Sequence, residues 1–125
     1  LPKTYHTNVK DMGSGSYEAA QYLNTLPNAK QLLIWTDKDG VCKFFVGRCK
    51  RGRNYQALRR DGLDYIIVSS DRKNRTVKMM SSEILHQKPG LIRFDQYYTK
   101  PNPIFELDIN GRQSQYVRIH EFKEE

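Results

Sequence analysis

Residues 13–35 read GSGSYEAAQYLNTLPNAKQLLIW and residues 63–68 read LDYIIV, and these two stretches decide the fold. Four apolar residues of the first stretch recur at the i, i+3, i+4, i+7 spacing of one helical face: Ala19, Tyr22, Leu23 and Leu26. Pro27 then ends the helix. The sequence therefore predicts a helix over 16–26 that leads into a short buried strand over 31–36, with a second such strand over 63–69.

The rest of the chain extends this pattern. Helical spacing of apolar residues predicts a helix over 72–87, and a short helix is expected over 91–98. Alternation predicts strands over 104–109 and 114–121, joined by Asn110-Gly111, the residue pair that a tight type I′ turn requires. The segment 41–46 is ambiguous between helix and strand. We therefore expect a small layered α/β domain of two or three layers, with a mixed sheet, a parallel centre and a C-terminal antiparallel hairpin.

The composition limits the size and the partners of this domain. The 125 residues suffice for one domain with a single core. The sequence has no apolar stretch near the roughly 20 residues that a membrane helix needs, and it begins with Leu1 instead of methionine. The formal net charge of +7 favours anionic partners, which include nucleic acid, anionic lipid and lipid-linked phosphate.

Three stretches resemble a known family. They are GSGSYEAAQYLN at 13–24 with the turn at 26–30, LLIWTDKDGVCKFFVGRCKRG at 32–52, and GLDYIIVSS at 62–70. Together they are similar to the C-terminal domain of polytopic membrane glycosyltransferases of the dolichyl-phosphate-mannose protein mannosyltransferase-like family. The resemblance covers most of the chain, although each piece alone is common among α/β domains.

The resemblance implies a function and a location. It implies an accessory domain on the extracytoplasmic side of the cell membrane, in an enzyme that transfers a sugar from a polyprenyl-phosphate donor. In such enzymes the catalytic acidic residue lies in a loop between membrane helices, so no catalytic residue and no cofactor are expected here. Residues 1–14 are then a linker from the membrane portion of the same polypeptide, 15–122 the domain, and 123–125 a frayed tail.

Most of the excess positive charge is local. Seven cationic residues lie between the two predicted parallel strands: Lys43, Arg48, Lys50, Arg51, Arg53, Arg59 and Arg60. Gly47, Gly52 and Asn54 in the same region favour a loop over a continuous helix. The loop is either a solvated basic surface or a site for anionic lipid or a lipid-linked sugar phosphate, where each nearby cation contributes about 1 kcal/mol.

Two cysteines, Cys42 and Cys49, flank the start of this region. The extracytoplasmic placement that the resemblance implies would permit a disulfide between them. The alternative is a pair of unlinked thiols, one of them buried as a small apolar residue. Their spacing does not match paired zinc ligands, and the three histidines are far apart in the sequence, so no metal site is predicted.

Asp37 and Asp39 follow the first predicted parallel strand, in the sequence TDKDG. Open α/β sheets bind ligands at the carboxyl ends of their strands, so these carboxylates are candidate contacts for a cation or a sugar hydroxyl. The alternative is an ordinary β-turn that ends at Gly40.

Two other classes of function compete with the transferase domain. A stand-alone nucleic-acid-binding module would use the loop over 43–60, with Tyr55 as a stacking partner among the cations. Nucleic acid is the less favoured partner, because no helix-turn-helix, zinc-finger or RNP motif accompanies that single aromatic residue. A small α/β enzyme is disfavoured because no spacing of Ser, His and Asp suggests a nucleophile with its base.

Overall fold

The computed structural model describes residues 3–7, 15–109 and 111–123. Its strands are β1 (Lys3–Thr7), β2 (Leu33–Thr36), β3 (Arg48–Lys50), β4 (Leu63–Ser69), β5 (Phe105–Ile109) and β6 (Arg112–Glu121). Its α-helices are α1 (Ser16–Asn24), α2 (Asp39–Phe44), α3 (Tyr55–Arg60) and α4 (Lys73–Leu85). Three 3₁₀ turns complete it: η1 (Ala29–Gln31), η2 (Ser70–Arg72) and η3 (Phe94–Tyr98).

The strands form one mixed sheet in the order β1-β5-β6-β4-β2-β3. β2 lies between β3 and β4 and is parallel to both, which confirms the predicted parallel centre. β6 is antiparallel to β4 and β5, which confirms the predicted C-terminal hairpin. The residue Asn110 of the predicted turn lies outside the described residues.

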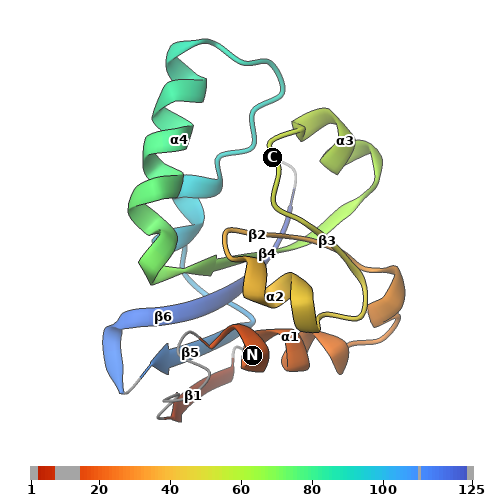
Figure 1. Cartoon of the computed structure of the whole chain (residues 1–125), viewed down its shortest axis with the longest axis vertical. Helices are drawn as coiled ribbons and strands as arrows, with labels where there is room; N and C mark the ends of the chain where they lie inside the picture. Colours follow the sequence, from red (N-terminus) through yellow and green to blue (C-terminus); the bar gives the residue numbers. More distant parts are fainter. Residues whose placement is uncertain (1–2, 8–14, 110, 124–125) are drawn as a thin grey trace.

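Helices cover both faces of the sheet, so the domain has three layers. Figure 1 shows α3 and α4 on one side of the sheet and α1 and α2 on the other. Alternate residues of β2 enter different cores: Leu33 and Trp35 pack with α3, α4 and η3, whereas Ile34 packs with α1 and α2. All four residues of β2 are buried, as expected for a central parallel strand.

The register between β2 and β4 shifts at Asp64. Leu33 pairs with Leu63 and Ile34 with Tyr65, so Asp64 has no partner residue on β2. Its carboxylate accepts a hydrogen bond of 2.9 Å from the Leu33 amide instead. The side chain thus replaces a backbone acceptor at the point where the ladder is irregular.

Three predictions about the secondary structure need correction or refinement. Within the predicted linker 1–14, the described residues Lys3–Thr7 form the edge strand β1, parallel to β5. The predicted basic loop contains β3 and the helix α3, which Asn54 caps by accepting a 3.1 Å hydrogen bond from the Ala57 amide. The short helix expected over 91–98 is present but shorter, as the 3₁₀ helix Phe94–Tyr98.

Two further segments are the ambiguous stretch 41–46 and the predicted frayed tail 123–125. The ambiguous segment 41–46 is mostly helical, since α2 spans Asp39–Phe44. Of the predicted frayed tail, only Lys123 is described, and its ammonium lies 3.3 Å from the Glu121 carboxylate.

Candidate anion-binding surface

A crevice is expected where neighbouring parallel strands send their chains to opposite faces of the sheet. The chain leaving β2 enters α2, whose Val41 belongs to the core on the α1 side. The chain leaving β4 enters η2 and then α4, whose Met80 belongs to the core on the opposite side. The carboxyl ends of β2 and β4 therefore form the switch point of this sheet.

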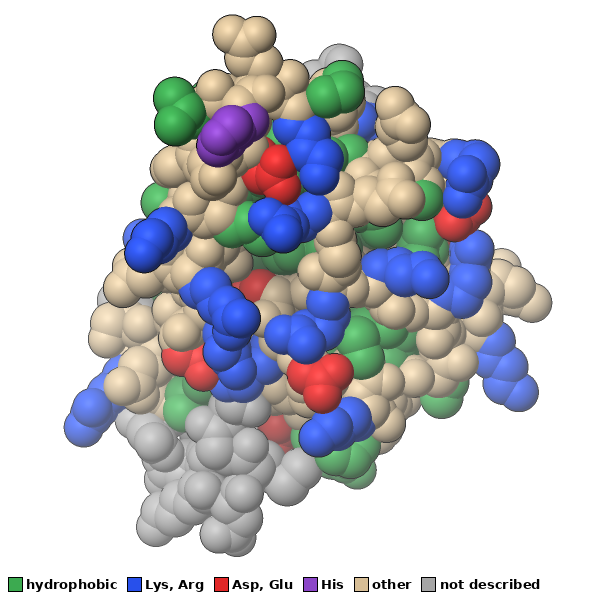
Figure 2. Space-filling view, turned by 45° about the horizontal axis from the view of Figure 1, so that its top comes forward, with side chains coloured by type: hydrophobic (Ala, Val, Ile, Leu, Met, Phe, Trp, Pro, Cys, Tyr) green, Lys and Arg blue, Asp and Glu red, His purple; other side chains and the backbone are tan. Residues whose placement is uncertain are grey.

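Charged side chains gather around this switch point. We define the carboxyl-end surface by five cations and three carboxylates: Lys38, Lys43, Arg51, Arg53, Lys88, Asp39, Asp71 and Glu83. Figure 2, which brings the end of the molecule with α3 and α4 forward, shows Lys and Arg side chains spread over the face with Asp and Glu side chains beside several of them. Cations outnumber carboxylates here, so the surface favours anionic ligands.

Asp37 is the buried residue beneath this surface. It is 8% exposed, and its carboxylate accepts a 2.9 Å hydrogen bond from the Ser69 amide and a 2.5 Å bond from the Tyr98 hydroxyl. Burial raises the pKa of Asp37 to about 6, although the bonds from Tyr98 and Ser69 act in the opposite direction. Asp37 therefore joins the ends of β2 and β4 to η3, which is a structural use of this predicted contact residue.

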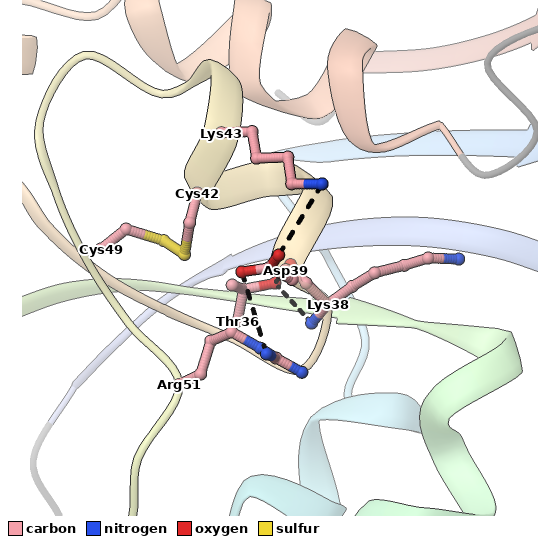
Figure 3. The surroundings of a disulfide bond; sticks show 7 residues. All are labelled: Thr36, Lys38, Asp39, Cys42, Lys43, Cys49 and Arg51. Atoms are coloured by element: carbon pink, nitrogen blue, oxygen red, sulfur yellow. Dashed lines mark hydrogen bonds and ion pairs between the residues drawn. A yellow bond between two sulfur atoms is a disulfide. The ribbon is translucent and has the colours of Figure 1, made fainter.

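Asp39 points instead toward two of the predicted cations. Its carboxylate oxygens lie 3.9 Å from the Lys43 ammonium and 3.8 Å from the Arg51 guanidinium. Figure 3 shows these two side chains converging on Asp39, which comes from the first turn of α2. Because these pairs are long and solvent-exposed, each is worth at most about 1 kcal/mol. An incoming phosphate can exchange for them at little cost.

The predicted disulfide between Cys42 and Cys49 is present in the structure. It joins α2 to β3, whose carboxyl end leads directly to Arg51 (Figure 3). Lys38, which precedes α2, forms an ion pair with Asp71 of η2, and its side chain is only 15% exposed. α2 is thus fixed to its surroundings at both ends, and Lys43 and Asp39 are held beside Arg51.

Arg53 extends the surface toward α4. Its guanidinium donates a 3.1 Å hydrogen bond to the carboxylate of Glu83, and Lys88 lies 3.7 Å from the same carboxylate. The Glu83 side chain is 10% exposed, whereas those of Arg53 and Lys88 are 51% and 43% exposed. A buried carboxylate therefore orients two cations that remain accessible to solvent.

The other predicted cations do not join this surface. Arg48 donates to the backbone carbonyls of Gln31 and Asp61, and Arg60 to the Asp61 carboxylate, so both lie near the amino ends of β2 and β4. Lys50 lines a separate cavity together with Arg60. Arg59 donates to the carbonyls of Gly90 and Leu91 on the far side of α3. The run of charge in the sequence is thus divided among several places.

Sequence reasoning missed Lys38, Asp71, Glu83 and Lys88. Lys38 stands between Asp37 and Asp39, directly after the buried strand. This position at the carboxyl end of the strand indicates a residue of the same surface. Asp71 is the analogous residue after the second strand. Glu83 and Lys88 become neighbours of Arg53 only through the packing of α4, and the local sequence around them gives no sign of it.

Neither a metal centre nor a membrane-spanning helix is found among the described residues. No group of three or more His, Cys, Asp or Glu side chains in the described chain is placed to hold a metal ion. Within residues 3–7, 15–109 and 111–123, every helix is too short or too polar to cross a bilayer.

Comparisons of this chain with protein-family models, with curated proteins and with solved structures return no match.

Proposed function

We propose that this chain is an extracytoplasmic accessory domain of a membrane glycosyltransferase that uses a polyprenyl-phosphate-linked sugar. The Cys42–Cys49 disulfide carries the proposal. Disulfides persist in oxidising compartments and are rare in the cytosol, so this bond supports a position outside the cytoplasm. The bond joins α2 to β3, and both elements lie within the stretch 32–52 that the family resemblance covers.

The carboxyl-end surface provides the contact with phosphate groups in this proposal. Arg51 and Arg53 have half-exposed side chains. The 3.1 Å hydrogen bond to Glu83 orients Arg53, whereas the longer pair with Asp39 leaves Arg51 available to a phosphate. Guanidinium groups match the geometry of phosphate oxygens, and a cation near an anionic bilayer contributes about 1 kcal/mol. The ligand is either an anionic lipid headgroup or the phosphate of the lipid-linked sugar.

Catalysis is assigned to the membrane portion of the enzyme. The family resemblance places the acidic residue that activates the acceptor between membrane helices, upstream of the region matched by this chain. The domain alone is therefore expected to leave a polyprenyl-phosphate-linked hexose intact. Its role is to hold the donor or the bilayer surface near the active site of the whole enzyme.

Binding to lipid vesicles tests the role of the surface. We expect the chain to cosediment with vesicles that contain phosphatidylglycerol but not with pure phosphatidylcholine vesicles. Arg51→Gln/Arg53→Gln removes two cations, so its affinity should fall about 30-fold. The matched control is Lys30→Gln/Arg60→Gln, which removes the same charge from exposed residues near the amino ends of β2 and β4.

Two results would contradict the proposal. Equal loss of affinity in both double variants would mean that net charge alone, and no particular surface, attracts the vesicles. Tighter binding to a short DNA duplex than to the vesicles, with a steep salt dependence, would favour the nucleic-acid-binding alternative. That alternative ranks second because the predicted cations are spread over several places and do not form one continuous basic surface.

A further inference from the structure

A second cationic site lies against η3, away from the carboxyl-end surface. A cavity of about 430 Å³ is found here, within the usual range of small-molecule sites. We call it the η3 pocket and define it by its lining residues. These are Arg59, Leu91, Ile92, Arg93, Gln96, Tyr97, Lys100, Phe122 and Lys123.

The charged side chains that line the η3 pocket are all cations. Arg59 comes from α3, Arg93 precedes η3, Lys100 follows η3, and Lys123 follows β6, so positive charge reaches the cavity from four segments. No carboxylate side chain is among the described lining residues. Cations around a cavity with apolar walls attract an anion more strongly than the same charges on an open surface.

The two arginines are held in place by the protein. The Arg59 guanidinium donates to the backbone carbonyls of Gly90 and Leu91, which fixes it against the loop that forms one wall. The Arg93 Nε and Nη2 atoms donate to both oxygens of Asp95, at 2.9 and 2.8 Å. A guanidinium oriented in this way loses little further freedom when it binds a ligand.

Lys100 contributes a cation next to an aromatic ring. Its ammonium lies 4.7 Å from the centroid of the Tyr97 ring. The charge of Lys100 is also felt in the interior. After burial it is the next cause that lowers the pKa of His120, to about 4, and the His120 ring packs against Tyr97. A bound anion would offset this positive charge.

The remaining lining residues suit a ring-shaped molecule. Leu91, Ile92 and Phe122 provide apolar surface, and the Gln96 amide can donate to and accept from hydroxyl groups. Pyranose rings have an apolar face and a rim of hydroxyls, and they fit a cavity of this size.

Two of the four cations already lie beside carboxylates, Arg93 beside Asp95 and Lys123 beside Glu121, which offset part of the positive charge. The charge that remains suits a phosphate monoester, which is close to a dianion at neutral pH.

We propose that the η3 pocket binds a phosphate monoester carried by a sugar-sized molecule. The monoester is either part of a soluble phosphorylated sugar or the headgroup of a lipid. This site is independent of the proposed transferase role, because none of its lining residues belongs to the carboxyl-end surface.

Titration followed by amide NMR and calorimetry tests the proposal. Glucose 6-phosphate should bind saturably, should shift the signals of residues around the pocket, and should bind more tightly than inorganic phosphate; glucose should not bind. Lys100→Gln should weaken binding about 10-fold or more, because a charge-assisted hydrogen bond is lost, and Lys100→Arg should restore most of it. Arg51→Gln/Arg53→Gln should leave the affinity within about twofold, since neither residue lines the pocket.

A lipid arm distinguishes the two sources of the monoester. Preference for phosphatidic acid vesicles over phosphatidylglycerol vesicles, lost in Lys100→Gln, would support the pocket with a lipid headgroup as its ligand. The absence of saturable binding to both glucose 6-phosphate and phosphatidic acid would overturn the proposal. Equal binding of glucose 6-phosphate by Lys100→Gln and the unmodified chain would overturn it as well.

Discussion

Replacing Gly47 by alanine should lower the free energy of unfolding by about 3 kcal/mol, and the melting temperature by about 10 °C. A Cβ atom at this position would lie 2.3 Å from the backbone carbonyl oxygen of Ala29 and 2.6 Å from the Phe45 ring. Ala29 begins η1, and its carbonyl already accepts a hydrogen bond from the Leu32 amide. The chain must shift here, because a backbone atom cannot move aside like a flexible side chain.

Gly52→Ala is the matched control for this substitution. A Cβ atom at Gly52 would meet no heavy atom within 4 Å beyond its chain neighbours, and neither glycine has a positive φ. The Gly52→Ala variant should stay within about 0.5 kcal/mol of the unmodified chain. Urea unfolding of both variants, followed by circular dichroism, measures the difference. Equal stability of the two variants would show that η1 and the segment before β3 are not packed as described.

Removing the carboxyl group of Asp37 should have the second large effect. At pH 4, Asp37→Ala leaves the buried Ser69 amide and the Tyr98 hydroxyl without this acceptor, at a cost of about 3 kcal/mol. At pH 7 the cost should be smaller, because the variant no longer buries a carboxylate charge. Asp37→Asn keeps an acceptor oxygen for both donors, so it should cost much less at neutral pH. The comparison separates the hydrogen bonds from the charge.

The charge of Asp37 gives a dependence on pH that Asp37→Asn lacks. The pKa of Asp37 is raised to about 6 in the folded chain from an ordinary value of 3.8. Below pH 3.8 the carboxyl is protonated in both states. As the pH rises from 3.8 to 6, the unfolded state loses its proton first and is stabilised. The folded chain should therefore lose about 3 kcal/mol of stability from this group by pH 7.

His120 acts in the opposite direction over the same pH range. Its pKa is lowered to about 4 from 6.5, mainly by burial, so its contribution to stability is lost as the pH falls. The measurement must therefore be the difference in unfolding free energy between the unmodified chain and Asp37→Asn, taken from pH 4 to pH 7. This difference should favour the unmodified chain more at pH 4. A difference that does not change with pH would contradict the buried position of Asp37.

The periodic elements were predictable from the sequence. The helix predicted over 16–26 is observed as Ser16–Asn24, and the strand predicted over 63–69 is observed with the same bounds. Both have long apolar patterns with clear signals at their ends, and most of the apolar residues in these patterns are buried, whereas Tyr22, Leu26 and Tyr65 are partly buried. The disulfide was predictable as one of two alternatives, because the cysteines stand seven positions apart and can close a small loop.

The short elements could not be predicted in the same way. β3 has three residues, and its side chains are exposed or only partly buried, so it has no apolar alternation. β1 pairs with β5, which is about a hundred residues away, and the local sequence around Lys3–Thr7 has no strong strand pattern. α3 begins directly after Asn54, which reads equally well as a turn residue and as a helix cap. These elements depend on contacts between distant segments.

The candidate site was predictable only in part. Asp37, Asp39, Lys43, Arg51 and Arg53 were all singled out from the sequence, and the structure brings Asp39, Lys43 and Arg51 together. Arg48, Arg59 and Arg60 lie elsewhere, because Arg48 is at the amino end of β3 and the other two are at the carboxyl end of α3. Glu83 lies on α4 and Lys88 follows it, about thirty residues along the chain from Arg53. Only the packing of α4 brings these two side chains to the surface.

The location of the domain in the full-length natural protein tests the central claim most directly. The native gene product should be found in the membrane fraction, and a protease added outside the cell membrane should cut this domain while cytoplasmic marker proteins stay intact. In the same sample, Cys42 and Cys49 should resist alkylation until a reductant is added. A product that stays in the cytosolic fraction with both thiols open to alkylation would contradict the claim.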